Sequence, residues 1–236
     1  MKGKLFLIPA YLTEEPHQEI ISLQVCELIK ITRHFLCENI RSARRYISSL
    51  KIHDSIESLH FEVLDKDTKL ESLPGLMAPL FAGNDMGIIS ESGCPGIADP
   101  GSLAVQYAHR HNITVVPLTG PSSILLGLMA SGLNGQKFAF HGYLPIDGVE
   151  AIQTIKNLER ESKEKNQTQI FIETPYRNNA LLGHLIKTLH PHTQLCVAIQ
   201  LTGPEEKIIS RPVMEWKNYP ETLAKEPAVF LFLASV

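Results

Sequence analysis

Two short segments concentrate glycine, proline and small hydroxyl residues directly after predicted strands. The first, SESGCPGIADPG, spans Ser90–Gly101 and contains three glycines and two prolines from Gly93 onward. The second, TGPSSI, spans Thr119–Ile124. Glycine lets a backbone adopt positive φ and approach a ligand closely, whereas proline stiffens a loop and cannot extend a strand. Ordinary strand-to-helix turns explain either loop alone, but two such loops after consecutive strands favour a binding site.

The elements that must position these loops follow a regular order in the first half of the chain. Apolar runs predict strands at residues 4–10, 35–39, 59–65, 86–90 and 114–118. Amphipathic segments predict helices at residues 18–32, 41–50, 102–111 and 122–131, with another starting near Leu73. Alternating strands and helices predict a mainly parallel sheet that is covered on both faces. Both loops then lie beyond the carboxyl ends of strands, where open α/β sheets bind ligands.

The second half of the chain has a different pattern. A charged helix at residues 149–165, a strand at 167–174 and a helix at 177–189 are followed by three strand-like runs with little helix between them. TGPEEK, residues 202–207, reads as a hairpin turn between the first two of these runs. We therefore expect two α/β domains, a mainly parallel one at residues 1–142 and one with a mixed sheet at 143–236.

Composition excludes several classes of protein. The 236 residues are 44% hydrophobic and 20% charged, with a net charge of −3, which gives no global attraction to nucleic acid. The longest apolar runs are far shorter than the ~20 residues of a membrane span. The apolar run near the N-terminus is too short for the core of a signal peptide, so we expect a cytoplasmic protein. GxGxxG, GxxxxGK[ST], HExxH and paired cysteines are all absent from the sequence, and we expect no metal.

Four motifs occur in an order that resembles the tetrapyrrole methylase superfamily: SESGCPGIADPG, PLTGPSSILLGLMASGL, FAFHGYLP and IFIETPYR. Members of this superfamily are S-adenosylmethionine-dependent methyltransferases with two α/β domains. The branch with the most similar motifs is the ribosomal small-subunit RNA 2′-O-ribose methyltransferases. The resemblance covers roughly Glu38–Arg177 and does not include the C-terminal helical extension of that branch.

The resemblance implies that S-adenosylmethionine binds in a cleft between the two domains. The residues that it implies from the first loop are Ser90, Glu91, Ser92, Gly93 and Ile97. Those that it implies from the second loop are Gly120, Pro121, Ser122, Ser123 and Ile124. Those that would close over the adenosine are Leu144, Pro145, Ala198 and Leu201.

Methyl transfer to an oxygen requires the acceptor to lose a proton, so a carboxylate near the acceptor is useful. Glu38, at the end of the second predicted strand, is the first candidate, and Glu173 is the second, with Arg177 beside it as a further catalytic candidate. The alternative for these carboxylates is a structural ion pair, of Glu38 with Arg41 or of Glu173 with Arg177.

The acceptor stays open at this point. Arg41, Arg44 and Arg45 share one face of a predicted helix, where they would contact phosphates if the acceptor is RNA or be merely solvated if it is not. The alternatives are a methyltransferase that acts on a tetrapyrrole or another small molecule, and a protein that binds S-adenosylmethionine without catalysis. The resemblance also implies a homodimer.

Overall fold

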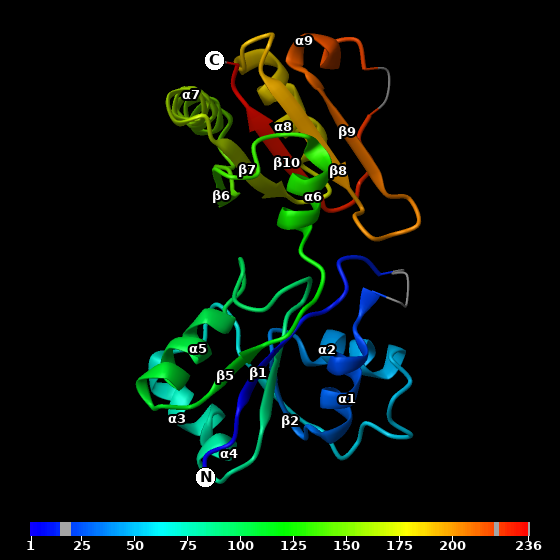
Figure 1. The fold of residues 1–236 in the computed structure, drawn as a ribbon, viewed down its shortest axis with the longest axis vertical. Helices are drawn as coiled ribbons and strands as arrows, with labels where there is room; N and C mark the ends of the chain where they lie inside the picture. The colour runs from blue at the N-terminus through cyan, green and yellow to red at the C-terminus, as the bar shows by residue number, and fades with distance from the viewer. Residues whose placement is uncertain (15–19, 220–221, 236) are drawn as a thin grey trace. The chain divides into compact units, whose positions relative to one another are not determined.

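The computed structural model describes residues 1–14, 20–219 and 222–235, which form two compact units, Met1–Ser122 and Ser123–Val236 (Figure 1). Each unit contains one five-stranded sheet. The units divide before helix α6, Ser123–Ser131, whereas the sequence places the boundary after Gly142. The physical reason is packing, since a Cβ at Gly127 of α6 would lie 3.5 Å from Leu231 in the second sheet.

The sheet of the first unit is parallel throughout. Its strands are β1 (Leu5–Ile8), β2 (His34–Cys37), β3 (His60–Val63), β4 (Met86–Ile89) and β5 (Val115–Pro117). They lie in the order β3-β2-β4-β1-β5, and every neighbouring pair is parallel. The predicted parallel sheet is thus confirmed. Because β1 lies between β4 and β5, the loops that follow these three strands emerge side by side.

Helices cover both faces of this sheet, as Figure 1 shows. The helices are α1 (Leu23–Ile31), α2 (Ile40–Ser49), α3 (Leu73–Leu76), α4 (Ala78–Phe81) and α5 (Gly101–Arg110), with a 3₁₀ turn at Leu70–Ser72. Phe35 of β2 packs in one core cluster with residues of α1 and α2, and the adjacent Leu36 packs in a second cluster with residues of α3, α4 and α5. Alternation of side chains along the strand therefore supplies two hydrophobic layers.

Two predicted helices differ in extent from the observed ones. The helix predicted from residue 18 begins at Leu23, because the Ser22 hydroxyl accepts a hydrogen bond from Val25 N and caps it. Residues 18 and 19 lie outside the described part of the chain. The helix predicted to start near Leu73 is divided into α3 and α4, because Pro74 and Pro79 each occupy a first helical turn and cannot donate a backbone hydrogen bond.

The second unit contains the mixed sheet that the sequence predicts. Its strands are β6 (Phe138–Tyr143), β7 (Thr168–Glu173), β8 (Gln194–Ile199), β9 (Lys207–Pro212) and β10 (Ala228–Leu233). The order is β6-β7-β10-β8-β9, in which β6 and β7 are parallel and the other pairs are antiparallel. The predicted hairpin is confirmed, since β8 and β9 pair from Ile199 with Lys207 onward.

Helices also lie on both faces of the second sheet. One core cluster joins Phe171 of β7 and Phe230 of β10 to residues of α7 (Gly148–Lys165), α8 (Asn178–Thr188) and α9 (Val213–Trp216). On the other side, α6 contacts strands β8, β9 and β10. Within the described ranges, no helix is long and apolar enough to cross a membrane.

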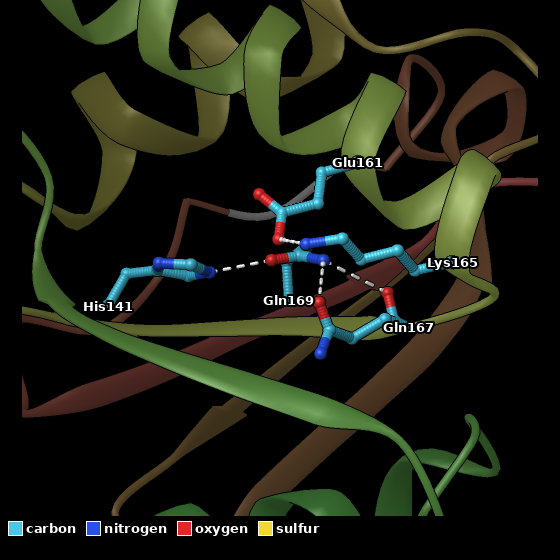
Figure 2. A network of polar contacts seen from close by, with 5 residues as sticks. All are labelled: His141, Glu161, Lys165, Gln167 and Gln169. Atoms are coloured by element: carbon cyan, nitrogen blue, oxygen red, sulfur yellow. Dashed lines mark hydrogen bonds and ion pairs between the residues drawn. The ribbon is translucent and has the colours of Figure 1, made fainter.

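A buried polar network holds β6, an edge strand, to β7 (Figure 2). Gln169 is fully buried, and its Nε2 donates to the carbonyl and side-chain oxygens of Gln167. Its Oε1 therefore accepts from His141 Nε2–H at 2.6 Å. His141 lies where the β6–β7 register shifts, between Phe140 and Tyr143.

Glu161 and Lys165 of α7 form an ion pair beside this network (Figure 2). The hydrogen bond from Lys165 lowers the pKa of Glu161.

Candidate functional site

Three loops meet at the carboxyl edge of the first sheet. Ala10 N, after β1, donates to Gly93 O, after β4, at 2.9 Å, and the two residues form an isolated antiparallel bridge. Cys94 Sγ, in the β4 loop, donates to Pro121 O, in the β5 loop, at 3.4 Å. The structure thus brings the two glycine-rich loops together, with the β1 loop between them.

The glycines of these loops permit close contact between loops. A Cβ on Gly120 would lie 2.2 Å from Cβ and Cγ of Pro9, which is far too close for real atoms. Gly93 has φ +70°, and its Cβ would lie 3.1 Å from Leu12 Cδ2 and 3.2 Å from Pro121 O. From the sequence, these glycines are predicted to allow a ligand to approach the backbone closely. In the structure, atoms of the neighbouring loops occupy the space that a side chain at either glycine would need.

The β4 loop is held by its own side chains. Ser90 Oγ donates to Ser92 O at 3.0 Å and accepts from Ser92 N at 3.3 Å. Asp99 Oδ1 accepts from Gly96 N at 2.9 Å and from Gly101 N at 2.6 Å. The Ser90 hydroxyl is therefore committed within the loop. Among the predicted contacts, Glu91, Ser92 and Ile97 are exposed and can meet a ligand.

Carboxylates gather around Glu38, directly after β2. Partial burial raises the pKa of Glu38, and the negative charges of Asp99, Glu91 and Asp65 raise it further. Glu38 forms no ion pair with the other described residues, so the structural alternative for Glu38, an ion pair with Arg41, is not observed. We call the edge formed by the carboxylates of Glu38, Asp65, Glu91 and Asp99 the acceptor-rich rim. It suits a ligand that carries a cation or hydroxyl donors. Across the described ranges, no group of three or more His, Cys, Asp or Glu residues could hold a metal ion.

Glu173 and Arg177 form an ion pair in the second unit. Arg177 Nη2 lies 3.1 Å from Glu173 Oε2, and the Glu173 side chain is fully buried. Glu173 Oε1 accepts from Thr174 N at 2.7 Å and from Thr174 Oγ1 at 3.1 Å. Arg177 Nη2 also donates to Pro145 O at 3.2 Å. The ion pair considered as the structural alternative therefore exists, and it ties the loop after β7 to the loop after β6.

The remaining predicted contacts belong to the second unit. Ser123 and Ile124 begin α6, so the predicted TGPSSI loop spans the division between units. Leu144, Ala198 and Leu201 have buried side chains, with exposures of 3%, 1% and 5%. Any ligand contact by these three residues would use their backbone atoms.

Several residues near these sites could not be identified as candidates from the sequence. Pro9 and Ala10 separate the two glycine loops because of strand order, which periodicity does not reveal. Thr202 follows Leu201 at φ +71°, and its buried Oγ1 lacks a hydrogen-bond partner among the described residues. Thr13 Oγ1, in the β1 loop, is also buried and also has no hydrogen-bond partner among the described residues. A ligand or water would satisfy either hydroxyl.

The three arginines of α2 have different surroundings. Arg44 lies over the ring of Phe61 on β3, 5.8 Å from its centroid. Arg41 is exposed, and Arg45 lies 4.0 Å from Glu14 with most of its side chain in solvent. Arg41 and Arg45 are therefore the members of the predicted cluster best placed to meet a phosphate.

Comparisons with known proteins find related sequences and a shared fold. The chain is 30% identical to ribosomal RNA small subunit methyltransferase I of Mesorhizobium japonicum over 188 residues, which cover 80% of this chain and 61% of that protein. It is 27% identical to the protein of the same name from Escherichia coli O157:H7 over 233 residues, which cover 98% of this chain and 77% of the relative. No family model matches the chain.

Among solved structures, uroporphyrin-III C-methyltransferase from Thermus thermophilus, complexed with S-adenosylhomocysteine, matches with a TM-score of 0.58. The match covers 98% of this chain and 97% of that one, at 16% sequence identity, and therefore concerns the fold. The chain is therefore similar in sequence to ribosomal RNA small subunit methyltransferases I, of which it spans 61% to 77% in these two cases, and it shares the fold of the Thermus thermophilus methyltransferase.

Proposed function

We propose that the chain is an S-adenosylmethionine-dependent methyltransferase that acts on ribosomal RNA, at a ribose 2′-hydroxyl. The observation that carries the proposal is the meeting of the β1, β4 and β5 loops at the carboxyl edge of the parallel sheet. The names of the sequence relatives support RNA over a tetrapyrrole as the acceptor.

In the first unit, the proposed cofactor contacts are the exposed parts of the β4 loop and the backbone around Gly120. The fit rests on the acceptor-rich rim, because S-adenosylmethionine bears a cationic sulfonium, an ammonium group and ribose hydroxyls. Glu91 and Ser92 are exposed there, Ile97 offers a half-exposed apolar side chain, and Thr13 Oγ1 lacks a hydrogen-bond partner among the described residues. Glu38, whose pKa is raised by partial burial and by the neighbouring negative charges, would be stabilised as a carboxylate by a nearby cation.

The chemistry that S-adenosylmethionine supplies is an electrophilic methyl group, so a C–O bond forms at the acceptor while the C–S bond breaks and S-adenosylhomocysteine leaves. The residues of this chain must then hold the acceptor and receive its proton. Glu38 is the proposed proton acceptor, because its carboxylate is partly buried and forms no ion pair among the described residues. Glu173 is the weaker candidate, since Arg177 neutralises it.

The RNA proposal extends to α2, where Arg41 and Arg45 would contact phosphates beside the β1 loop, with Arg44 held against Phe61. A homodimer and a cytoplasmic location are part of the same proposal, and they rest on the resemblance to the tetrapyrrole methylases and on the ribosomal substrate named for the relatives. Sedimentation velocity of the purified chain tests the dimer directly.

The deciding experiment is transfer of radiolabelled methyl from S-adenosylmethionine to purified ribosomal small subunits from a strain that lacks this protein. The expected result is incorporation into RNA, resistant to alkaline hydrolysis at the modified position. Subunits from the parent strain, already methylated, serve as the matched control and should accept little label. Label in neither preparation, despite calorimetric binding of S-adenosylhomocysteine, would contradict an RNA substrate and leave cofactor binding intact.

A further inference from the structure

An exposed tyrosine, Tyr176, follows the carboxyl end of β7, beside the loop that follows β6. Because these neighbouring strands are parallel, the loops that follow them emerge at the same edge of the second sheet. Tyr176, after β7, is 86% exposed, and Ile146, after β6, is 84% exposed. The hydrogen bond from Arg177 Nη2 to Pro145 O joins the two loops. An exposed ring at a strand's carboxyl end is a position from which a protein contacts a ligand.

The turn that presents Tyr176 is rigid. Arg177 N donates to Thr174 O at 3.0 Å across Pro175, whose φ is fixed by its ring. Thr174 is itself bonded to the buried carboxylate of Glu173 on both N and Oγ1. The backbone that presents the ring is thus fixed by these hydrogen bonds, so contact with a partner would require little ordering of the backbone.

A cation is held beside the ring by a second set of contacts. Lys225 Nζ lies 5.9 Å from the centroid of the Tyr176 ring. The backbone on both sides of Lys225 is hydrogen-bonded to the start of α8, two residues after Tyr176 in the sequence. Asn178 Nδ2 donates to Ala224 O at 3.2 Å and to Glu226 O at 2.7 Å, and Asn178 is fully buried. Asn179 exchanges two hydrogen bonds with the backbone of Leu223.

We infer that Tyr176 and Lys225 form a contact point for single-stranded RNA, with a base stacked on the Tyr176 ring and a phosphate near Lys225 Nζ. The inference rests on the proposed function, and it names a substrate contact in the second unit beyond the cofactor site and the arginines of α2. A base has an aromatic face and an adjacent phosphate, which match an exposed ring with a cation above it. Partly buried Glu226 follows Lys225 and offsets its charge, so stacking supplies more of the affinity than charge does.

The test measures binding of a fluorescein-labelled single-stranded RNA of about 10 nucleotides by fluorescence anisotropy. Tyr176→Ala should weaken binding by about 5- to 100-fold, and Tyr176→Phe should bind like the parent chain, because stacking uses the ring. Lys225→Gln should lower the salt dependence of log K by about 0.7, the value for one phosphate contact on a single strand. Phe138→Ala, which removes a partly exposed ring at the other end of β6, is the matched control and should change nothing.

A second arm replaces the RNA bases by abasic sites. On abasic RNA, the parent chain and Tyr176→Ala should bind with equal affinity, because no base is left to stack on the ring. The inference is overturned if Tyr176→Ala binds normal RNA as the parent does, or if the parent binds neither this RNA nor ribosomal small subunits. Calorimetry with S-adenosylhomocysteine on the same samples separates these outcomes from a failure of the proposed function, because cofactor binding should be unchanged in Tyr176→Ala.

Discussion

The hydroxyl of Tyr46 donates a 2.7 Å hydrogen bond to the backbone carbonyl of Pro9. Tyr46 lies on α2 and is 8% exposed, and the ring of Tyr11 packs edge-to-face against it at 5.3 Å. Pro9 in turn occupies the space beside Gly120. Helix α2 thereby fixes the β1 loop, and the β1 loop fixes the spacing between the two glycine-rich loops.

Tyr46→Phe should therefore both destabilise the fold and weaken cofactor binding. The variant leaves the buried Pro9 carbonyl without its donor, which costs about 1–3 kcal/mol in the free energy of unfolding. Urea denaturation measures this loss, and calorimetry with S-adenosylhomocysteine measures the affinity. The control is Tyr107→Phe, because the described residues offer no hydrogen-bond partner to the Tyr107 hydroxyl. Equal unfolding free energies for both variants would show that the Tyr46 bond contributes nothing.

Gly120→Ala should disrupt the contact between the β1 and β5 loops. Its Cβ would meet the rigid Pro9 ring at 2.2 Å, so one loop must move, at a cost of about 1–3 kcal/mol. Thermal denaturation and S-adenosylhomocysteine binding should both be impaired. Gly75→Ala is the matched control, since a Cβ there meets nothing within 4 Å. Wild-type stability in Gly120→Ala would mean that the two loops are not in firm contact.

Glu38 should make stability depend on pH in a stated direction. Its pKa is higher in the folded chain than its ordinary value of 4.5, so ionisation is less favourable in the folded state than in the unfolded one. The resulting destabilisation is complete above the raised pKa and disappears as pH falls to 4.5. Glu38→Gln should consequently melt at a higher temperature than the parent at pH 7, and the two curves should converge toward pH 4.5. Parallel curves over this range would contradict the assigned shift.

The same substitution tests the acceptor-rich rim. Glu38→Gln should weaken binding of cationic S-adenosylmethionine more than that of S-adenosylhomocysteine, whose sulfur is uncharged, because it removes negative charge from the rim. Calorimetry with the two ligands under one buffer gives the ratio. An unchanged ratio would place the sulfonium away from Glu38 and weaken its assignment as proton acceptor.

Glu173 and Arg177 should be coupled in stability. Arg177→Gln leaves a fully buried carboxylate without its cation, at a cost of about 3 kcal/mol, whereas the double variant with Glu173→Gln removes the charge and should recover part of that loss. A double-mutant cycle by chemical denaturation measures the coupling. Simple addition of the two single effects would indicate that Arg177 serves mainly to hold Pro145.

Alternation and turn chemistry predicted a large part of the fold. The strand ending at Ile89 and the loop from Ser90 were recognisable because a buried apolar run is followed by residues that cannot continue it. The mixed character of the second sheet followed from three strand runs with almost no helix between them. Both are local properties of the sequence, which is why they could be predicted.

Long-range pairing could not be predicted in this way. The position of β1 between β4 and β5 brings Pro9 against Gly120, and no local pattern contains that information. Assignment of α6 to the second sheet depends on its contacts with distant strands such as β10. The Tyr46 hydroxyl similarly finds its acceptor 37 residues away. Contacts between loops therefore explain Gly93 and Gly120, and no local pattern in the sequence reveals those contacts.

Strand β10 lies in the middle of the second sheet, between β7 and β8, although it is the final strand along the described chain. During translation, β6 with β7 and β8 with β9 therefore emerge as two separate pieces, each with an unpaired edge, until residues 228–233 leave the ribosome. The first unit has all its strands by Pro117 and can complete its sheet much earlier. Synthesis thus passes through a stage in which a finished first unit is attached to an unfinished sheet with exposed edges, the stage most open to aggregation.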